Sequence, residues 1–355
     1  MVFGEELKQY HADAPSISVI HDYQITDVFT IGSNISTHTR FQAASISKMV
    51  FTLSVLCLVA QNKISLDDDV GKYIAPLYLK NSNGLLARAT VRQILSHTAG
   101  FGVSGFDGYG RNVKLPTTEQ IILGEFPCNS PKIIQEYIPG KHCIYSGGGF
   151  IILQKCIENI SGMPFADFME QTVLYPLDMT DSTFRQNITE NIVEGYFVAC
   201  DRVSKGYNFM PEQAAAGLWT TASDLARFGI HLQNILRGKT GLVPQMLVQE
   251  MIRPQHREIL DLDNIPCKTG LGCYLQYIHD AVYFGHSGRN CGFESQINFS
   301  VQNGKGCCIL ANSDDIFPLI EKIQDYFLGS RPEEWIKNKS LGAVVKKTTT
   351  PRLHS

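Results

Sequence analysis

Apolar and polar positions alternate near both ends of the chain, as they do in strands. Two strands are predicted over residues 16–20 and 27–32, with a polar turn between them. Four more short apolar segments are separated by turn residues and are predicted to be strands: 272–277, 281–284, 294–301 and 306–311. Strands from the two ends must pair to bury their apolar faces, so the pattern predicts one antiparallel sheet built from both ends of the chain.

Between about residues 75 and 250 the apolar positions recur with the period of helices, and the loops are rich in glycine and proline. An apolar helix is expected over 45–62, and others over 90–97 and 148–161, the last closed by Gly162. A further helix begins near residue 221 with Ser223 as its N-cap, and an amphipathic helix covers 318–328. The acidic run 67–69 is compatible with a metal site, but its setting favours a solvated loop that caps the next helix.

This order of elements predicts an α+β fold, in which helices flank an antiparallel sheet and a mostly helical lobe is inserted. We expect a single domain over 1–330. Its α/β lobe is formed by about 1–75 and 265–330, and its helical lobe by about 76–264. Residues 331–355 are polar and irregular and are expected to form a loosely held tail.

Composition restricts the classes of function. The chain has 355 residues, 44% hydrophobic and 18% charged, with a net charge of −3, which favours neither nucleic acid nor an anionic membrane as a partner. The beginning of the sequence lacks the features of a signal peptide, and the longest apolar stretch, 49–60, is too short to span a bilayer. We therefore expect a soluble, cytoplasmic protein. Its oligomeric state is left open by the sequence.

The chain contains ten cysteines, without a Cys-x-x-Cys pair, and most of them lie in apolar runs. Buried thiols are therefore expected rather than metal ligands. The absence of a disulfide-like spacing favours a reducing compartment.

The first candidate for chemistry is a Ser-x-x-Lys pair, Ser45 and Lys48, at the start of the long apolar helix. Residues three apart share one face of a helix, so the lysine amine can reach the serine hydroxyl. An amine can act as a base only if its charged form is destabilised, for example by burial. The alternative interpretation is an ordinary helix start with a surface lysine.

Two further motifs lie far along the chain from this pair. In Tyr145-Ser146-Gly147, a glycine-rich turn could present the phenol in a cleft; a nearby cation would lower its pKa, so that it could pass protons. In His286-Ser287-Gly288, glycines on both sides of the histidine-serine pair would let a substrate approach the strand edge. Taken alone, each motif is also compatible with a purely structural tyrosine or histidine.

The three motifs, in this order and at these intervals, resemble the serine β-lactamase and penicillin-binding-protein superfamily, in particular the class C β-lactamase-related branch with its DD-peptidases and esterases. That branch carries Ser-x-x-Lys, then Tyr-x-Asn or a variant, then Lys/His-x-Gly. Segments 95–101 (LSHTAGF) and 215–227 (AAGLWTTASDLAR) also resemble segments of the family. The resemblance spans about residues 14 to 328. His97 lies in the first of these segments, which is structural in such proteins.

The resemblance implies that Ser45 is a nucleophile that forms an acyl-enzyme, with Lys48 and Tyr145 sharing the proton transfers. His286 would line the site opposite them, and the backbone N–H groups of Ser45 and Arg289 would form the oxyanion hole. The residues implied to contact substrate are Gly147, Ser287, Gly288 and Arg289. The resemblance implies no cofactor and no metal, and a small molecule or short peptide as substrate.

Two departures from the family pattern move the prediction away from β-lactams. Gly147 replaces an asparagine whose amide binds an acylamido group, and His286 replaces a lysine that binds a carboxylate. A further hypothesis is that Arg289 supplies the missing positive charge. The Lys-Thr-Gly triplets at 239–241 and 268–270 are rejected as site motifs in favour of His286-Ser287-Gly288.

These departures favour a cofactor-free serine esterase, amidase or peptidase over an efficient β-lactamase. A DD-peptidase or penicillin-binding protein is one alternative, and a non-catalytic scaffold that kept the fold is another. Specificity is expected to lie in loops such as 102–116, whose shape the sequence does not determine.

Overall fold

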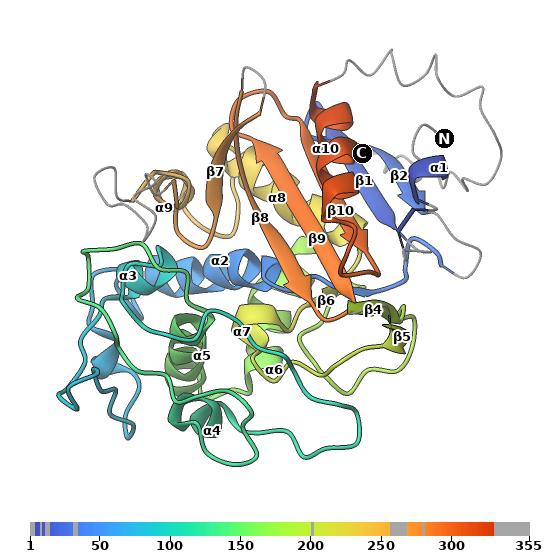
Figure 1. Cartoon of the computed structure of the whole chain (residues 1–355). Helices are drawn as coiled ribbons and strands as arrows, with labels where there is room; N and C mark the ends of the chain where they lie inside the picture. Colours follow the sequence, from blue (N-terminus) through green and yellow to red (C-terminus); the bar gives the residue numbers. More distant parts are fainter. Residues whose placement is uncertain are drawn as a thin grey trace.

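The computed structural model describes residues 4–7, 9–10, 15–30, 35–199, 202–255, 268–278 and 281–329. Its main feature is a six-stranded antiparallel sheet with the strand order β2-β1-β10-β9-β8-β7 (Figure 1). The strands are β1 (Ser16–His21), β2 (Gln24–Thr30), β7 (Tyr274–Ile278), β8 (Ala281–Asn290), β9 (Phe293–Ser300) and β10 (Gly306–Ala311). Strand β1 pairs with β10, which joins the two ends of the chain and confirms the predicted α+β fold.

Helices cover both faces of this sheet. Successive strand residues point to opposite faces, and β10 shows this directly. Its Cys307 and Ile309 pack in the apolar cluster that contains helix α10 (Phe317–Gly329), whereas Cys308 and Leu310 belong to the main core with helix α8 (Ala222–Leu236). Figure 1 shows α10 in front of the sheet and α8 behind it.

Helix α2 (Ile46–Ala60) lies between the sheet and the helical lobe (Figure 1). It is apolar on all sides, and the thirteen residues from Ile46 to Leu58 are all buried. A helix that is apolar all round is stable only when it is enclosed by protein. Its central position places the Ser-x-x-Lys motif where the two lobes meet.

The helical lobe is built around helix α5 (Gly147–Ser161), which ends at the predicted Gly162 in the left-handed conformation. Its other α-helices are α3 (Val91–Leu95), α4 (Thr118–Leu123), α6 (Phe165–Met169) and α7 (Gln213–Ala216). Helix α9 (Gln245–Met251) packs against α8, and the short helix α1 (Gly4–Leu7) lies near the N-terminus. The described residues also form two short 3₁₀ helices, η1 (Val70–Lys72) and η3 (Tyr175–Leu177), and a short π-helix, η2 (Glu170–Leu174).

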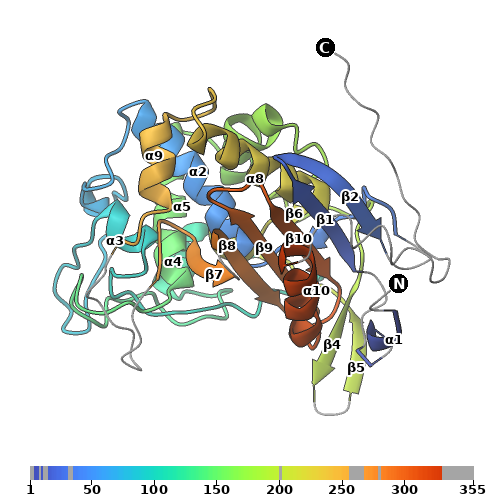
Figure 2. The same cartoon turned by 90° about the horizontal axis from the view of Figure 1, so that it is seen from above.

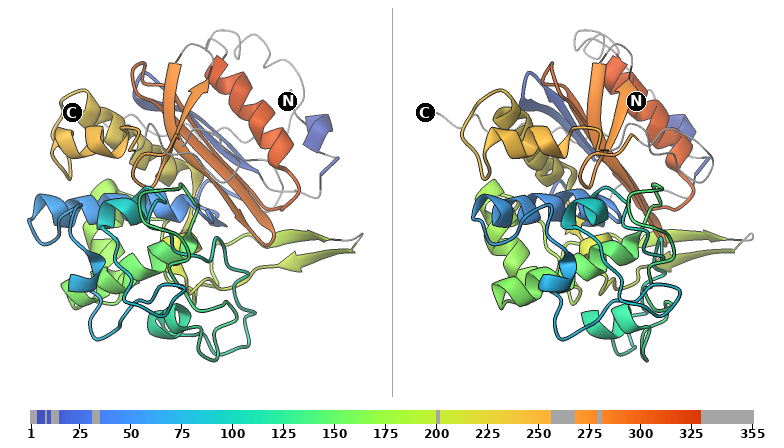
Figure 3. Two further views of the ribbon diagram at one scale, coloured as in Figure 1. Left: turned by 60° about the vertical axis from the view of Figure 1, so that its left-hand side comes forward. Right: turned by 90° about the vertical axis from the view of Figure 1, so that its left-hand side faces the viewer.

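Two small ribbons complete the fold. Strands β3 (Phe41–Gln42) and β6 (Trp219–Thr220) pair just before α2 and α8, respectively. Strands β4 (Gly195–Ala199) and β5 (Arg202–Gly206) form a hairpin that projects from the body of the molecule (Figures 2 and 3). This hairpin is not among the strands predicted from the sequence.

Three local predictions are corrected by the structure. Helix α8 is capped by Thr221 rather than Ser223, because the Thr221 hydroxyl accepts a hydrogen bond from the Asp224 N–H at 3.2 Å. Strand β8 continues to Asn290, since pairing with β9 extends through the glycine-flanked motif. Much of the inserted lobe, including 98–117 and 125–146, consists of turns and irregular segments without helix, because its glycines and prolines interrupt the helical period.

The acidic run behaves as predicted, since the Asp69 carboxylate accepts a hydrogen bond from the Gly71 N–H at 2.7 Å and caps η1. The prediction of buried thiols is confirmed for Cys57, Cys156, Cys273, Cys307 and Cys308. It is wrong for Cys143, which is disulfide-bonded, and the free thiols of Cys128 and Cys291 are half-buried and exposed, respectively. Over the described ranges, no helix is long and apolar enough to cross a membrane. The tail predicted over 331–355 lies outside the described residues.

Candidate active site

Ser45 lies at the N-cap of α2, at the junction of the two lobes. An N-cap serine usually accepts a hydrogen bond from the first turn of its helix, but the Ser45 side chain makes no such bond. The preceding residue, Ala44, has a φ of 49°, a left-handed conformation that is uncommon for a residue with a Cβ. Ala43 is anchored by its N–H to the Leu218 carbonyl at 2.9 Å. This sharp turn leaves the half-buried Ser45 hydroxyl available for other partners.

The Lys48 amine is the first of these partners. Its Nζ lies 3.1 Å from Ser45 Oγ and donates to the carbonyl oxygen of Ala215, in α7, at 2.7 Å. The side chain is 1% exposed, and burial lowers its pKa from 10.5 to about 7. A large fraction of Lys48 is therefore uncharged at neutral pH, which is the state that a base requires. The interpretation of Lys48 as a surface lysine is wrong.

Tyr145 lies on the other side of the amine, just before α5. Lys48 Nζ is 4.9 Å from the centre of the Tyr145 ring, and the phenol also hydrogen-bonds with Ser45. Burial raises the phenol pKa to about 12, and the bond with Ser45 offsets only part of this effect. The expected lowering of this pKa by a nearby cation is therefore wrong, because desolvation of the buried phenol is the dominant effect.

His97 packs against the Tyr145 ring and binds the backbone of the next residue. Its Nδ1 accepts the Ser146 N–H at 3.2 Å, and its ring centre is 4.5 Å from that of Tyr145. Burial, with Lys48 and His286 nearby, lowers the pKa of His97 well below its usual value, so the imidazole is neutral. Its φ of 59° and its buried position fit the structural function that was expected for this segment.

His286, from β8, forms the opposite wall. Its ring centre is 6.2 Å from that of Tyr145 and 5.0 Å from that of Tyr274, in β7. Burial, reinforced by Lys48, lowers the His286 pKa to about 3, so this histidine is neutral. Its Nδ1 donates to the carbonyl of Ser287, which leaves Nε2 as an acceptor, and this atom is buried without a partner among the described residues.

Gly288 allows β8 to lie directly against the turn that carries Ser45. A Cβ at this position would be 2.3 Å from the Ala43 carbonyl oxygen and 3.0 Å from Ala44 Cβ. Ser295, in β9, reinforces this contact by donating to the same Ala43 oxygen at 2.9 Å. The spacing between the third motif and the Ser45 turn therefore depends on the absence of a side chain at 288.

We expect Gly288→Ala to lower the free energy of unfolding by about 1–3 kcal/mol, the usual cost of overpacking. It should also lower kcat/KM, because the Ala43 oxygen cannot move without moving Ser45. Thermal unfolding and ester hydrolysis measure the two effects. Gly110→Ala is the matched control, since a Cβ there meets nothing within 4 Å. Equal behaviour of the two variants would contradict the close contact.

Arg289 does not supply the missing positive charge. Neighbouring residues of a strand point to opposite faces. Position 288 faces Ala43, so the Arg289 side chain extends from the other face of β8. Its guanidinium donates to the Asp314 carbonyl at 2.7 Å and pairs with Glu294 at 3.4 Å. The hypothesis that Arg289 binds a substrate carboxylate is not supported by this geometry. Its backbone N–H remains the predicted oxyanion donor.

A buried network of side-chain amides, not predicted from the sequence, links β8 to β3 and α7. Asn290, at the end of β8, donates to Gln42 Oε1 at 2.8 Å and to the Ala216 carbonyl at 3.2 Å. Gln42 in turn donates to the Asn208 carbonyl at 2.6 Å. Because Ala216 follows the carbonyl that holds Lys48, the network fixes α7 relative to the third motif. No local sequence signal marks these amides as partners.

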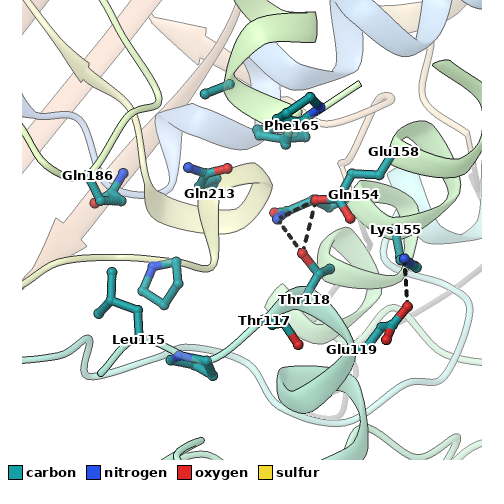
Figure 4. A pocket seen from close by; sticks show the side chains of 14 residues that line it. Leu115, Thr117, Thr118, Glu119, Gln154, Lys155, Glu158, Phe165, Gln186 and Gln213 are labelled. Carbon is teal, nitrogen blue, oxygen red and sulfur yellow. Dashed lines mark hydrogen bonds and ion pairs between the residues drawn. The ribbon is translucent and has the colours of Figure 1, made fainter. Parts of the chain in front are cut away.

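A cavity of about 520 Å³ lies apart from this group, in the helical lobe (Figure 4). Its walls include Gln154 and Glu158 of α5, Glu119 of α4 and Gln213 of α7, and no residue of the three motifs lines it. The Gln154 Oε1 accepts the Ala214 N–H at 2.9 Å. A side chain of the cavity wall thus binds α7 at Ala214, the residue before Ala215, whose carbonyl accepts a hydrogen bond from Lys48.

The two rejected Lys-Thr-Gly triplets lie outside the group. The first, at 239–241, follows α8. In the second, Thr269 donates to the Ser96 carbonyl at 3.3 Å, and Lys268 is exposed. The structure instead brings together Ser45, Lys48, Tyr145 and His286 from three distant segments of the chain.

Comparison with known proteins shows the family of the chain. The sequence model of the family described as Beta-lactamase matches residues 2–322. The chain belongs to this family. It is 24% identical over 297 residues to protein flp of Staphylococcus aureus (strain MRSA252), a match that covers 81% of the chain and 56% of flp. The chain thus spans little more than half the length of this curated relative.

A second curated relative and a solved structure extend the comparison. The chain is 25% identical over 255 residues to esterase EstB of Burkholderia gladioli, covering 63% of the chain and 64% of EstB. Its fold is similar to that of the octameric penicillin-binding protein homologue from Pyrococcus abyssi, with a TM-score of 0.76 and 23% identity over 94% of this chain and 77% of the homologue. The recognition of the superfamily from its motifs is confirmed.

Proposed function

We propose that this Beta-lactamase family member is a serine hydrolase that cleaves a small ester or amide through an acyl-enzyme on Ser45. The observation that carries the proposal is the contact between Ser45 Oγ and Lys48 Nζ at 3.1 Å, made by a buried amine whose pKa is about 7. A serine hydroxyl becomes a useful nucleophile when an adjacent base can accept its proton. The similarity to esterase EstB supports a hydrolase that acts on esters.

In the proposed reaction, neutral Lys48 accepts the Ser45 proton while Oγ attacks the substrate carbonyl carbon. The N–H groups of Ser45 and Arg289 would stabilise the resulting oxyanion. Tyr145, with its pKa near 12, holds its proton and can donate it to the leaving alcohol or amine, then recover a proton from Lys48. Water then attacks the acyl-enzyme, releasing the acid and regenerating Ser45.

The wall opposite Ser45 argues for a substrate without a carboxylate next to the scissile bond. His286 is buried and neutral, so it offers no positive charge to a substrate carboxylate. The Arg289 guanidinium is bonded to Glu294 and Asp314. An ester, amide or short peptide therefore fits this site better than a β-lactam.

A fluorophosphonate probe tests the proposal against the alternative of a non-catalytic scaffold. We expect the wild-type chain to be labelled at a single residue, which peptide mass spectrometry identifies as Ser45, and Ser45→Ala not to be labelled. Ser47→Ala is the matched control because Ser47 is buried and donates to the Ala44 carbonyl. Labelling that survives Ser45→Ala, or wild-type protein that takes no label, would overturn the acyl-enzyme proposal.

A further inference from the structure

The first two glycines of α5, Gly147 and Gly148, contact the loop of residues 102–106, which precedes them in the chain. Gly147 N–H donates to the Ser104 carbonyl at 3.2 Å, and Gly148 N–H donates to the Val103 carbonyl at 2.9 Å. A Cβ on Gly148 would lie 2.7 Å from the Gly102 carbonyl oxygen. Side chains at these positions would push the loop away, so the glycines allow residues 102–106 to lie directly on the helix start.

The loop is held in one unusual conformation. Val103 has a φ of 63°, which is a rare conformation for a β-branched residue and persists only where neighbouring contacts determine it. Those contacts are on both sides, since Gly102 N–H also donates to the Ile134 carbonyl at 2.9 Å and its own carbonyl accepts from Ser146 Oγ at 3.0 Å. Ser146 is the residue next to Tyr145, so the loop and the phenol are fixed together.

The packing of this loop on α5 places the ring of Phe106 beside Gly147. A Cβ on Gly147 would lie 2.9 Å from Phe106 Cε2, so the phenylalanine ring fills the space that a side chain at 147 would occupy. Gly147 is two residues from Tyr145, at the third position of the second motif. An apolar ring, half-buried against the core, thus stands where a polar amide would otherwise project.

We propose that Phe106 is a specificity-determining residue that packs against the acyl group of the substrate and selects uncharged, apolar acyl groups over acylamido ones. This inference rests on the proposed acyl-enzyme function and names the substrate class of the same site. A ring offers no hydrogen-bond partner to an amide, and burying an amide without a partner is costly. Neutral His286 and half-buried Tyr274 continue the uncharged wall on the opposite side.

The experiment compares two p-nitrophenyl esters with the same leaving group and similar acyl length, those of valerate and of N-acetylglycine. We expect the wild-type protein to prefer the valerate ester in kcat/KM. Phe106→Ala should reduce this preference about tenfold, the scale of a lost apolar contact in a specificity pocket. Phe106→Leu should retain most of it.

The outcomes separate the two proposals. Two results would overturn the function of Phe106 while leaving the acyl-enzyme proposal intact. One is a wild-type preference for the N-acetylglycine ester. The other is a ratio of kcat/KM for the two esters that is the same in both Phe106 variants as in the wild type. Absence of hydrolysis of either ester, with Ser45 unlabelled by the fluorophosphonate, would overturn both. Thermal unfolding of each variant shows whether it is folded, and Phe106→Leu keeps an apolar side chain if Phe106→Ala does not fold.

Discussion

Replacement of Lys48 by methionine is expected to lower kcat/KM for an ester substrate by about 10³-fold, within the range typical of a lost general base. Methionine fills a similar volume but has no amine to accept the Ser45 proton. The wild-type rate should also depend on pH. Lys48 has a pKa of about 7, so kcat/KM should rise as pH increases through 7 and then level off. Stopped assays between pH 5 and 10 measure both effects.

The stability of the same variant provides a control. The unfolded Lys48 keeps its proton up to its ordinary pKa of 10.5, whereas the folded residue loses it at about 7. The buried amine therefore destabilises the fold fully below pH 7, and this cost disappears as pH rises toward 10.5. Lys48→Met should remove the cost, so it should unfold at a higher temperature than wild type at pH 6. Lower stability at pH 6, or an activity profile without a step near pH 7, would contradict a buried, neutral amine.

Removal of the Tyr145 hydroxyl is expected to have the second largest effect. Tyr145→Phe keeps the ring against His97 and Lys48 but removes the group that carries a proton to the leaving group. We expect kcat for an alkyl ester to fall about 10²-fold, as for a lost general acid. The loss should be smaller for a p-nitrophenyl ester, because nitrophenolate leaves without protonation.

This dependence on the leaving group separates proton transfer from packing. A series of esters of one acid with alcohols of increasing pKa gives the comparison, for wild type and Tyr145→Phe. Because burial holds the phenol pKa near 12, the wild-type rate should show no loss of a proton from Tyr145 below pH 10. Equal losses for all leaving groups would indicate that Tyr145 only supports the shape of the site.

The predictions from the sequence succeeded where local patterns carry the information. Short apolar segments bounded by turn residues gave β1 and β10, and the Ser-x-x-Lys spacing at the start of the apolar run of α2 placed Ser45 and Lys48 one turn apart. The prediction failed for the cap of α8, where Thr221 and Ser223 are both acceptable caps and packing decides between them. It also shortened β8, because glycines lower strand propensity while pairing with β9 holds Gly285 and Gly288 in the sheet.

The sequence by itself determined the family and the α+β class, and it predicted the serine, amine and phenol of the candidate site, because each depends on residue types at fixed spacing. Only the tertiary structure decided their chemical state and their neighbours. The pKa values of Lys48 and Tyr145 follow from burial, and the ring of Phe106 beside Gly147 follows from how a distant loop packs. Burial and packing arise between segments far apart in the chain, so no local pattern records them.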